Sequence, residues 1–118
     1  MFDARLTKDD EHRAQVLELE GNFTLDEKGR VDALLLEITS CDYIGVVLDI
    51  SKIKFIDSAG LMAVLSIFNK LMRVDKSMVV ATGGNPYAEG KIKELGLLRI
   101  PKFQAFESAE EAKRALAR

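Results

Sequence analysis

The most informative part of the sequence is an aliphatic run that leads into a helix start. It reads Val46-Val47-Leu48-Asp49-Ile50-Ser51 and, after a few residues, Ile56-Asp57-Ser58-Ala59-Gly60-Leu61. The continuous run from Val46 to Ile50 is typical of a strand that is buried on both faces of a sheet. Asp57 is a favourable N-cap, because its carboxylate can accept hydrogen bonds from the free amides one turn into a helix. The stretch therefore predicts a strand–helix unit of an α/β fold.

Comparable patterns lie on both sides of this stretch. Alternating apolar and polar residues predict two short strands in a hairpin near the N-terminus, with a polar turn at residues 7–10. Apolar residues at helical spacing then predict a helix, and Thr24 with Glu27 fits a capping box at its start. The expected strands are 2–6, 14–20, 46–50, 78–81 and 103–106, and the other helices are expected to begin at Asp57, at Asn85-Pro86 and at Ser108, where Glu111 completes a second capping box.

The order of these elements predicts one α/β domain that spans residues 1–118. Strands that alternate with helices favour a largely parallel sheet, which the N-terminal hairpin makes mixed. We expect about four α-helices. The segment between the strand at 46–50 and the helix at Asp57 is expected to be a brief connection at the carboxyl end of a strand, where ligands and partners often bind in such folds.

The composition limits what the chain can do. Its 118 residues carry 17 Lys and Arg against 19 Asp and Glu, a net charge of −2, and they include no basic run that could follow a phosphate backbone. No apolar stretch approaches the ~20 residues that span a bilayer, and the N-terminus lacks the plan of a signal peptide. We therefore expect a cytoplasmic protein that contacts neither nucleic acid nor membrane directly.

The scarcity of histidine and cysteine argues against most familiar enzyme classes. His12 and Cys41 are the single residues of their types, so a two-histidine metal site and an internal disulfide are excluded. No histidine lies near Ser58 in the sequence to act as the base that would make it a nucleophile. Asp49 could act as the phosphoacceptor of a receiver domain, but the first strand ends in Arg5-Leu6-Thr7 and lacks the acids that would hold Mg²⁺. We expect no catalytic residue, metal or cofactor.

The stretch at residues 46–61 resembles the signature of the STAS domain, which is found in bacterial anti-sigma factor antagonists and sulphate transporters. In that signature an apolar strand ends in Asp and a hydroxyl residue, and Asp-Ser-x-Gly-Leu opens a helix a few residues later, as residues 46–51 and 56–61 do. The resemblance covers nearly the whole chain, including Val79-Val80-Ala81 and the segment from Ile92 to Leu97. It implies a single STAS-like domain.

The resemblance also implies a regulatory function without catalysis. In the antagonist branch the anti-sigma factor, an ATP-dependent serine kinase, phosphorylates the serine of the motif. The unphosphorylated antagonist binds that kinase and frees the sigma factor for transcription, and a phosphatase resets this partner-switching cycle. In this sequence the implied phosphorylation site is Ser58, with Asp57 as its orienting neighbour. The implied partner-binding residues are Asp57, Ser58, Ala59, Gly60, Met62, Thr24 and Asn22.

The chain departs from the family at one place, and other functions stay open. Many antagonists read Gly-Glu-Leu-Asp where this chain has Gly21-Asn22-Phe23-Thr24, so Thr24 replaces an acidic residue.

Met62 and Ile67 lie off the main apolar stripe of their helix, and they are expected either to form an exposed partner-binding patch or to pack on the flank of the sheet. The alternative functions are a STAS-domain subunit or scaffold in lipid transport or stress signalling, and a phosphorelay receiver that uses Asp49.

Overall fold

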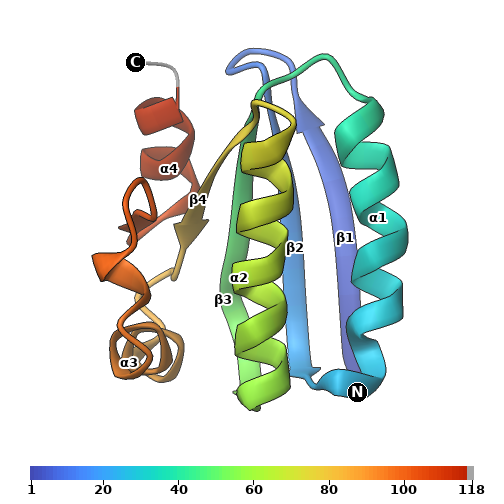
Figure 1. Ribbon diagram of the computed structural model, residues 1–118. Coiled ribbons are helices and arrows are strands. Elements are labelled where there is room, and N and C mark those ends of the chain that lie inside the picture. The colour runs from blue at the N-terminus through green and yellow to red at the C-terminus, as the bar shows by residue number, and fades with distance from the viewer. Residues whose placement is uncertain (117–118) are drawn as a thin grey trace.

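Strands and helices alternate in the order that the sequence predicts, in a computed structural model that describes residues 1–116 (Figure 1). Within those residues the strands are β1 (Phe2–Asp9), β2 (Ala14–Phe23), β3 (Gly45–Ile56), β4 (Ser77–Ala81) and β5 (Ala105–Phe106). The α-helices are α1 (Lys28–Ser40), α2 (Ser58–Arg73), α3 (Pro86–Glu94) and α4 (Ala109–Leu116). Short 3-10 turns, Leu25–Glu27 and Leu97–Arg99, precede α1 and follow α3. No helix in this part of the chain is long and apolar enough to cross a membrane.

The strands form a mixed sheet with the order β1-β2-β3-β4-β5. β1 and β2 are antiparallel, whereas β2, β3, β4 and β5 are parallel to one another. Residues of α1, α2 and α3 pack on one face of the sheet, across which α1 and α2 lie side by side, and α4 packs on the opposite face (Figure 1). This arrangement confirms the expected α/β fold with an antiparallel hairpin, a mixed sheet and four α-helices.

The helices bury their apolar faces against the sheet. In α2, Leu61, Val64 and Phe68 follow helical spacing and belong to the larger core. Ile67 is 2% exposed and lies in the same core, whereas Met62 is 58% exposed. Of the two residues that lie off the main stripe, only Met62 is therefore exposed. Ile67 is buried because α2 packs against both the sheet and α1 and so buries a wide face.

β3 is longer than its aliphatic run, because residues 51–56, expected to be a connection, continue the strand. The register against β2 shifts twice, and at each shift β3 contains one extra residue. Such bulges bend a strand and change the direction of its side chains. As a result Ile50, Ile53 and Ile56, which are three residues apart, all enter the larger core, and Phe55 is turned to the surface.

The hairpin strands extend beyond their expected ends. Residues 7–9, expected in a turn, belong to β1 and pair with β2. β2 passes through Gly21, whose φ of +89° suits glycine, and continues to Phe23, which pairs with Ile56. β5 is shorter than expected and starts at Ala105, because a turn with a φ of +70° at Lys102 precedes it.

Three of the four N-caps that the sequence predicts are confirmed. The side chains of Asp57, Asn85 and Ser108 accept hydrogen bonds from backbone amides at the starts of α2, α3 and α4. The capping box at Thr24 and Glu27 was a wrong prediction, because the Thr24 side chain makes no capping bond. Because Phe23 is still paired with β3, the chain turns tightly after it in a 3-10 turn. In this turn the Glu27 amide donates to the Thr24 carbonyl at 3.0 Å, and α1 begins only after it.

A second, smaller core lies between the sheet and α4, and substitutions there test how the two faces of the sheet are packed. Val47 is fully buried there with Val79, Ala81 and Ala112, and Leu65 of α2 is only partly buried on the other face. We expect Val47→Ala to lower the free energy of unfolding by about 2 kcal/mol through lost burial and a new cavity, and Leu65→Ala to cost less. Urea denaturation measures both values. A larger loss for Leu65→Ala than for Val47→Ala would contradict this packing.

Candidate functional site

The candidate site is built around the start of α2, where Ser58 occupies the first helical position and is exposed. Asp57 Oδ1 accepts a hydrogen bond from the Gly60 amide at 2.7 Å, and the Asp57 carbonyl accepts one from the Leu61 amide at 3.0 Å. The first amides of a helix have no acceptor within the helix, which leaves those of Ser58 and Ala59 for an external anion. The positive end of the helix dipole lies at the same place.

Gly60 connects α2 closely to the end of β2. A Cβ atom at this position would lie 2.4 Å from the Phe23 carbonyl oxygen and 2.7 Å from Ile56 Cγ1. The Asp57 amide donates to the same Phe23 carbonyl at 3.4 Å. Gly60 is buried, so its contribution to a partner surface is indirect: it allows the segment that contains Asn22 and Thr24 to lie beside the start of α2.

The N-cap residue of α3, Asn85, and Tyr87 in its first turn fix the end of β3 that carries the site. Asn85 Nδ2 donates to the carbonyls of Ser51 and Ile53 at 3.1 and 2.9 Å. The Tyr87 hydroxyl accepts from the Ile56 amide at 2.9 Å and donates to the Ile56 carbonyl at 3.3 Å. β4 pairs only with residues 45–49 of β3, so these bonds replace a neighbouring strand along the last residues before Asp57.

Large apolar side chains are exposed on three segments that meet near the start of α2. Met62 lies one helical turn after Ser58 and is 58% exposed, and Phe55, three residues before it, is 48% exposed. Leu25, in the turn after β2, is 65% exposed. The register places Asn22 opposite Phe55. We refer to Leu25, Phe55 and Met62 as the apolar rim.

The structure thus brings most of the sequence-predicted site residues together. Asn22 and Thr24 lie beside Asp57 through the pairing of β2 with β3, and Asn22, Ser58 and Met62 are exposed. Sequence analysis missed Leu25 and Phe55, the other members of the apolar rim. Strand alternation from the buried Ile53 would place Phe55 inside, and only the bulge between them reverses its direction.

Among the described residues, Asp49 lies opposite the acid Glu18 of β2, whose carboxylate pairs with Lys52 at 3.2 Å. The Oδ1 atom of Asp49 accepts a hydrogen bond from the Ser51 amide at 2.9 Å. Within residues 1–116, the group of three side chains placed closely enough to share a metal ion is Asp9, Glu11 and His12, which excludes Asp49. The receiver interpretation therefore gains no support from this part of the chain.

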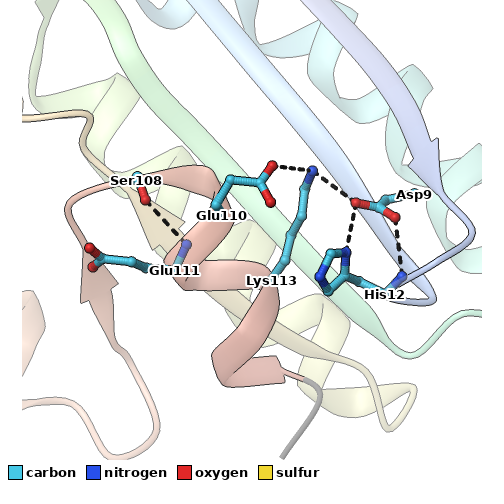
Figure 2. Close-up of polar contacts among 6 residues, drawn as sticks. All are labelled: Asp9, His12, Ser108, Glu110, Glu111 and Lys113. Atoms are coloured by element: carbon cyan, nitrogen blue, oxygen red, sulfur yellow. Dashed lines mark hydrogen bonds and ion pairs between the residues drawn. The ribbon is translucent and has the colours of Figure 1, made fainter.

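Asp9 instead takes part in an ion-pair network that ties α4 to the hairpin (Figure 2). Lys113 Nζ lies 2.9 Å from Asp9 Oδ2 and 3.2 Å from Glu110 Oε1. His12 Nδ1 and its backbone amide also contact the Asp9 carboxylate, at 3.0 and 3.1 Å. The hydrogen bond from Lys113, followed by that from the His12 amide, lowers the pKa of Asp9 well below its ordinary 3.8. The same bond to Asp9 raises the pKa of Lys113 above 10.5.

These shifts predict how stability depends on pH. Because the folded-state pKa of Asp9 is lowered, its carboxylate stabilises the fold above its unfolded pKa, and this contribution is lost as the pH falls below about 4. The raised pKa of Lys113 has the opposite sign, so its contribution is lost at strongly alkaline pH. We expect Asp9→Asn to flatten the acid side of the stability curve in thermal melts. Asp42→Asn, which removes an exposed carboxylate, should keep the wild-type slope, and equal slopes for all three proteins would contradict the pairing of Asp9 with Lys113.

Comparisons with known proteins identify the family and the fold of the chain. The model of the STAS domain family matches residues 5–112, so the chain belongs to the STAS domain family. None of the curated protein sequences matches the chain.

Solved structures with low sequence identity share the fold. An anti-sigma factor antagonist from Mycobacterium paratuberculosis is 17% identical with a TM-score of 0.82, over 100% of this chain and 96% of that chain. The phosphorylated form of SpoIIAA, a cell-fate determinant of Bacillus, is 17% identical with a TM-score of 0.68, over 96% and 99% of the two chains. A sulfate transporter family protein from Wolinella succinogenes is 14% identical with a TM-score of 0.75, over 93% and 88%.

Proposed function

We propose that this protein is an anti-sigma factor antagonist that is switched by phosphorylation at Ser58. In its unphosphorylated form it binds an anti-sigma factor that is an ATP-dependent serine kinase and so releases the sigma factor. The kinase phosphorylates Ser58, which ends the complex, and a phosphatase for phosphoserine restores the binding form. The protein itself is regulatory and cytoplasmic, catalyses no reaction and needs no metal or cofactor.

The observation that carries the proposal is the exposed Ser58 hydroxyl at the first position of α2, within the STAS motif. A phosphate group there would meet the amides of Ser58 and Ala59 and the positive end of the helix dipole, so the modified protein keeps its fold. The modification adds a charge of about −1.5 to −2 next to Asp57. In a desolvated interface that charge opposes binding by repulsion and by loss of solvation.

The apolar rim supplies the area that a partner can bury around the switch. Leu25, Phe55 and Met62 come from three different elements, and the bonds of Asn85 and Tyr87 hold the strand that carries Phe55. Exposed aromatic and methionine side chains are typical of protein interfaces. The Asn22 and Thr24 side chains lie beside this rim, where many antagonists have acids. An antagonist with acidic residues at these positions selects a partner with a complementary charge. We therefore expect the partner of this protein to carry a different charge on the surface that faces Asn22 and Thr24.

The decisive experiment incubates the protein with candidate anti-sigma serine kinases and ATP and locates any phosphate by mass spectrometry. Phosphoserine at position 58, absent from the Ser58→Ala variant, supports the proposal. Phosphate on Asp49 would support a receiver instead. The absence of modification by every kinase tested would favour a STAS subunit or scaffold of another assembly.

The apolar rim gives a separate prediction for the same partner. Phe55→Ser is expected to weaken binding of the anti-sigma factor by roughly tenfold or more, because aromatic anchors commonly dominate an interface. Val74→Ser is the matched control, since Val74 is equally exposed, at 49%, but lies at the far end of α2. Isothermal titration measures both. Equal affinities for the two variants would place the interface elsewhere.

A further inference from the structure

A second candidate site is a cleft at the carboxyl ends of β4 and β5. Thr82 directly follows β4 and Glu107 directly follows β5, and the Thr82 amide donates to the Phe106 carbonyl at 2.9 Å. The chain leaves β4 to form α3 on one face of the sheet, whereas it leaves β5 to form α4 on the other face (Figure 1). Where the connections of neighbouring parallel strands diverge in this way, a crevice opens in which α/β proteins commonly bind ligands.

Much of the lining of this cleft is apolar, and its volume is about 220 Å³. The apolar lining residues come from α3, from the 3-10 turn after it and from β5, and they are Ile92, Leu98, Ala105 and Phe106. Leu98 is 45% exposed, so its side chain is accessible to a ligand. A cavity of about 150 Å³ can hold benzene. The cleft is therefore large enough for one aromatic ring with a short substituent.

Glu89 is the charged group that the fold holds in place in this cleft. It is half-buried, and its Oε1 atom accepts a hydrogen bond from the Thr82 hydroxyl at 3.1 Å. Thr82 is 3% exposed, so this bond anchors the carboxylate to the end of β4. Within residues 1–116 no basic side chain forms an ion pair with Glu89, although Lys93 lies one helical turn later and lines the same cleft. The carboxylate has thus lost part of its contact with water without gaining an opposite charge, which a bound cation would supply.

We propose that this cleft binds a small primary amine with an aromatic body. The ammonium group of the ligand contacts the Glu89 carboxylate, and its ring packs on Leu98 and Phe106. The other charged residues of the lining are Glu107 and Lys93, so two Glu against one Lys give a net charge of −1, which matches a single positive charge. The inference goes beyond the function proposed for Ser58 and does not depend on it, because no residue that lines the cleft belongs to α2 or to the apolar rim.

The test titrates the ¹⁵N-labelled protein with 2-phenylethylamine. We expect saturable chemical-shift changes at the amides of Thr82, Glu89 and Leu98, with a dissociation constant of roughly 1 mM, because so small a ligand makes few contacts. 2-Phenylethanol keeps the ring without the charge, and ethylamine keeps the charge without the ring, so each should bind roughly tenfold more weakly. The absence of saturable shifts up to about 10 mM amine, shifts centred outside the cleft, or equal binding of 2-phenylethanol would overturn the proposal.

Two pairs of variants test the assigned contacts. Glu89→Gln removes the charge but keeps an oxygen that can accept from Thr82, so it should weaken binding of the amine roughly tenfold and leave binding of 2-phenylethanol unchanged. Its matched control, Glu94→Gln, removes an exposed carboxylate of the same helix outside the cleft and should bind like the wild type. Leu98→Ser should weaken binding of both ligands, whereas Leu95→Ser, at a residue that is 47% exposed but does not line the cleft, should weaken neither. Undiminished binding of the amine by both Glu89→Gln and Leu98→Ser would place the ligand elsewhere and refute the assignment.

Discussion

Phosphorylation of Ser58 is expected to weaken binding of the anti-sigma factor by about a hundredfold, which corresponds to ~3 kcal/mol. The phosphate adds its charge beside Asp57, on the helix that also carries the exposed Met62 of the apolar rim. Ser58→Glu adds a smaller charge at the same position, so we expect a loss of roughly tenfold. Ser58→Ala should bind persistently, because it cannot be phosphorylated and therefore cannot be released.

The substitutions at Ser58 should leave the stability of the fold nearly unchanged. Asp57 caps α2 in every variant, and an acidic side chain in the first helical turn is tolerated or mildly favourable. We expect the free energy of unfolding of Ser58→Ala and Ser58→Glu to lie within about half a kcal/mol of the wild-type value. The matched control is Ser77→Glu, which places the same charge on an exposed serine at the opposite end of the sheet and should leave binding unchanged.

Isothermal titration against the anti-sigma factor, with thermal melts of each protein, measures both effects. Equal affinity for the wild type, the phosphorylated protein and Ser58→Glu would refute the charge switch. A large drop in melting temperature for Ser58→Ala would show that Ser58 is needed for the fold, and its exposure at the helix start would then need another explanation.

The order of elements and the starts of α2 and α3 could be predicted from sequence, because both depend on local signals. The aliphatic run at 46–50 predicts a buried strand, and the capping residues Asp57 and Asn85 predict two helix starts that the structure confirms. These signals act over one or two helical turns, so a single sequence contains all that they require.

The exact shape of the site could not be predicted, because it depends on contacts between distant segments. Residues 51–56 have no clear strand alternation, and they are held as a strand by pairing with β2 and by the side chains of Asn85 and Tyr87, which are more than 30 residues away. The resulting bulges decide which of these residues are exposed. Only the structure, which contains the bulges, shows that Phe55 is exposed and belongs to the candidate site. Thr24 shows the same effect, since the pairing of Phe23 with Ile56 replaces the expected capping box by a 3-10 turn.

Gly60 offers the sharpest test of how this site is assembled. Replacing a helical glycine by alanine normally stabilises a protein by about 0.5–1 kcal/mol, because the unfolded chain loses freedom. Gly90→Ala in α3 should behave in this way, since a Cβ atom there meets nothing within 4 Å. Gly60→Ala should instead lower the free energy of unfolding by about 1–3 kcal/mol, because the new methyl group would lie 2.4 Å from the backbone oxygen of Phe23.

The same substitution should also disturb function, because relief of the clash requires the end of β2 to move away from α2. That movement would separate Asn22 and Thr24 from Ser58, and we expect Gly60→Ala to bind the anti-sigma factor more weakly than Gly90→Ala even at temperatures where both are folded. Urea denaturation gives the two stabilities, and titration of the folded proteins gives the two affinities. If Gly60→Ala matched Gly90→Ala in stability, the close packing of α2 on β2 would be wrong. If it were destabilised yet bound normally, the segment that contains Asn22 and Thr24 would lie outside the interface, and the partner would recognise α2 and the apolar rim alone.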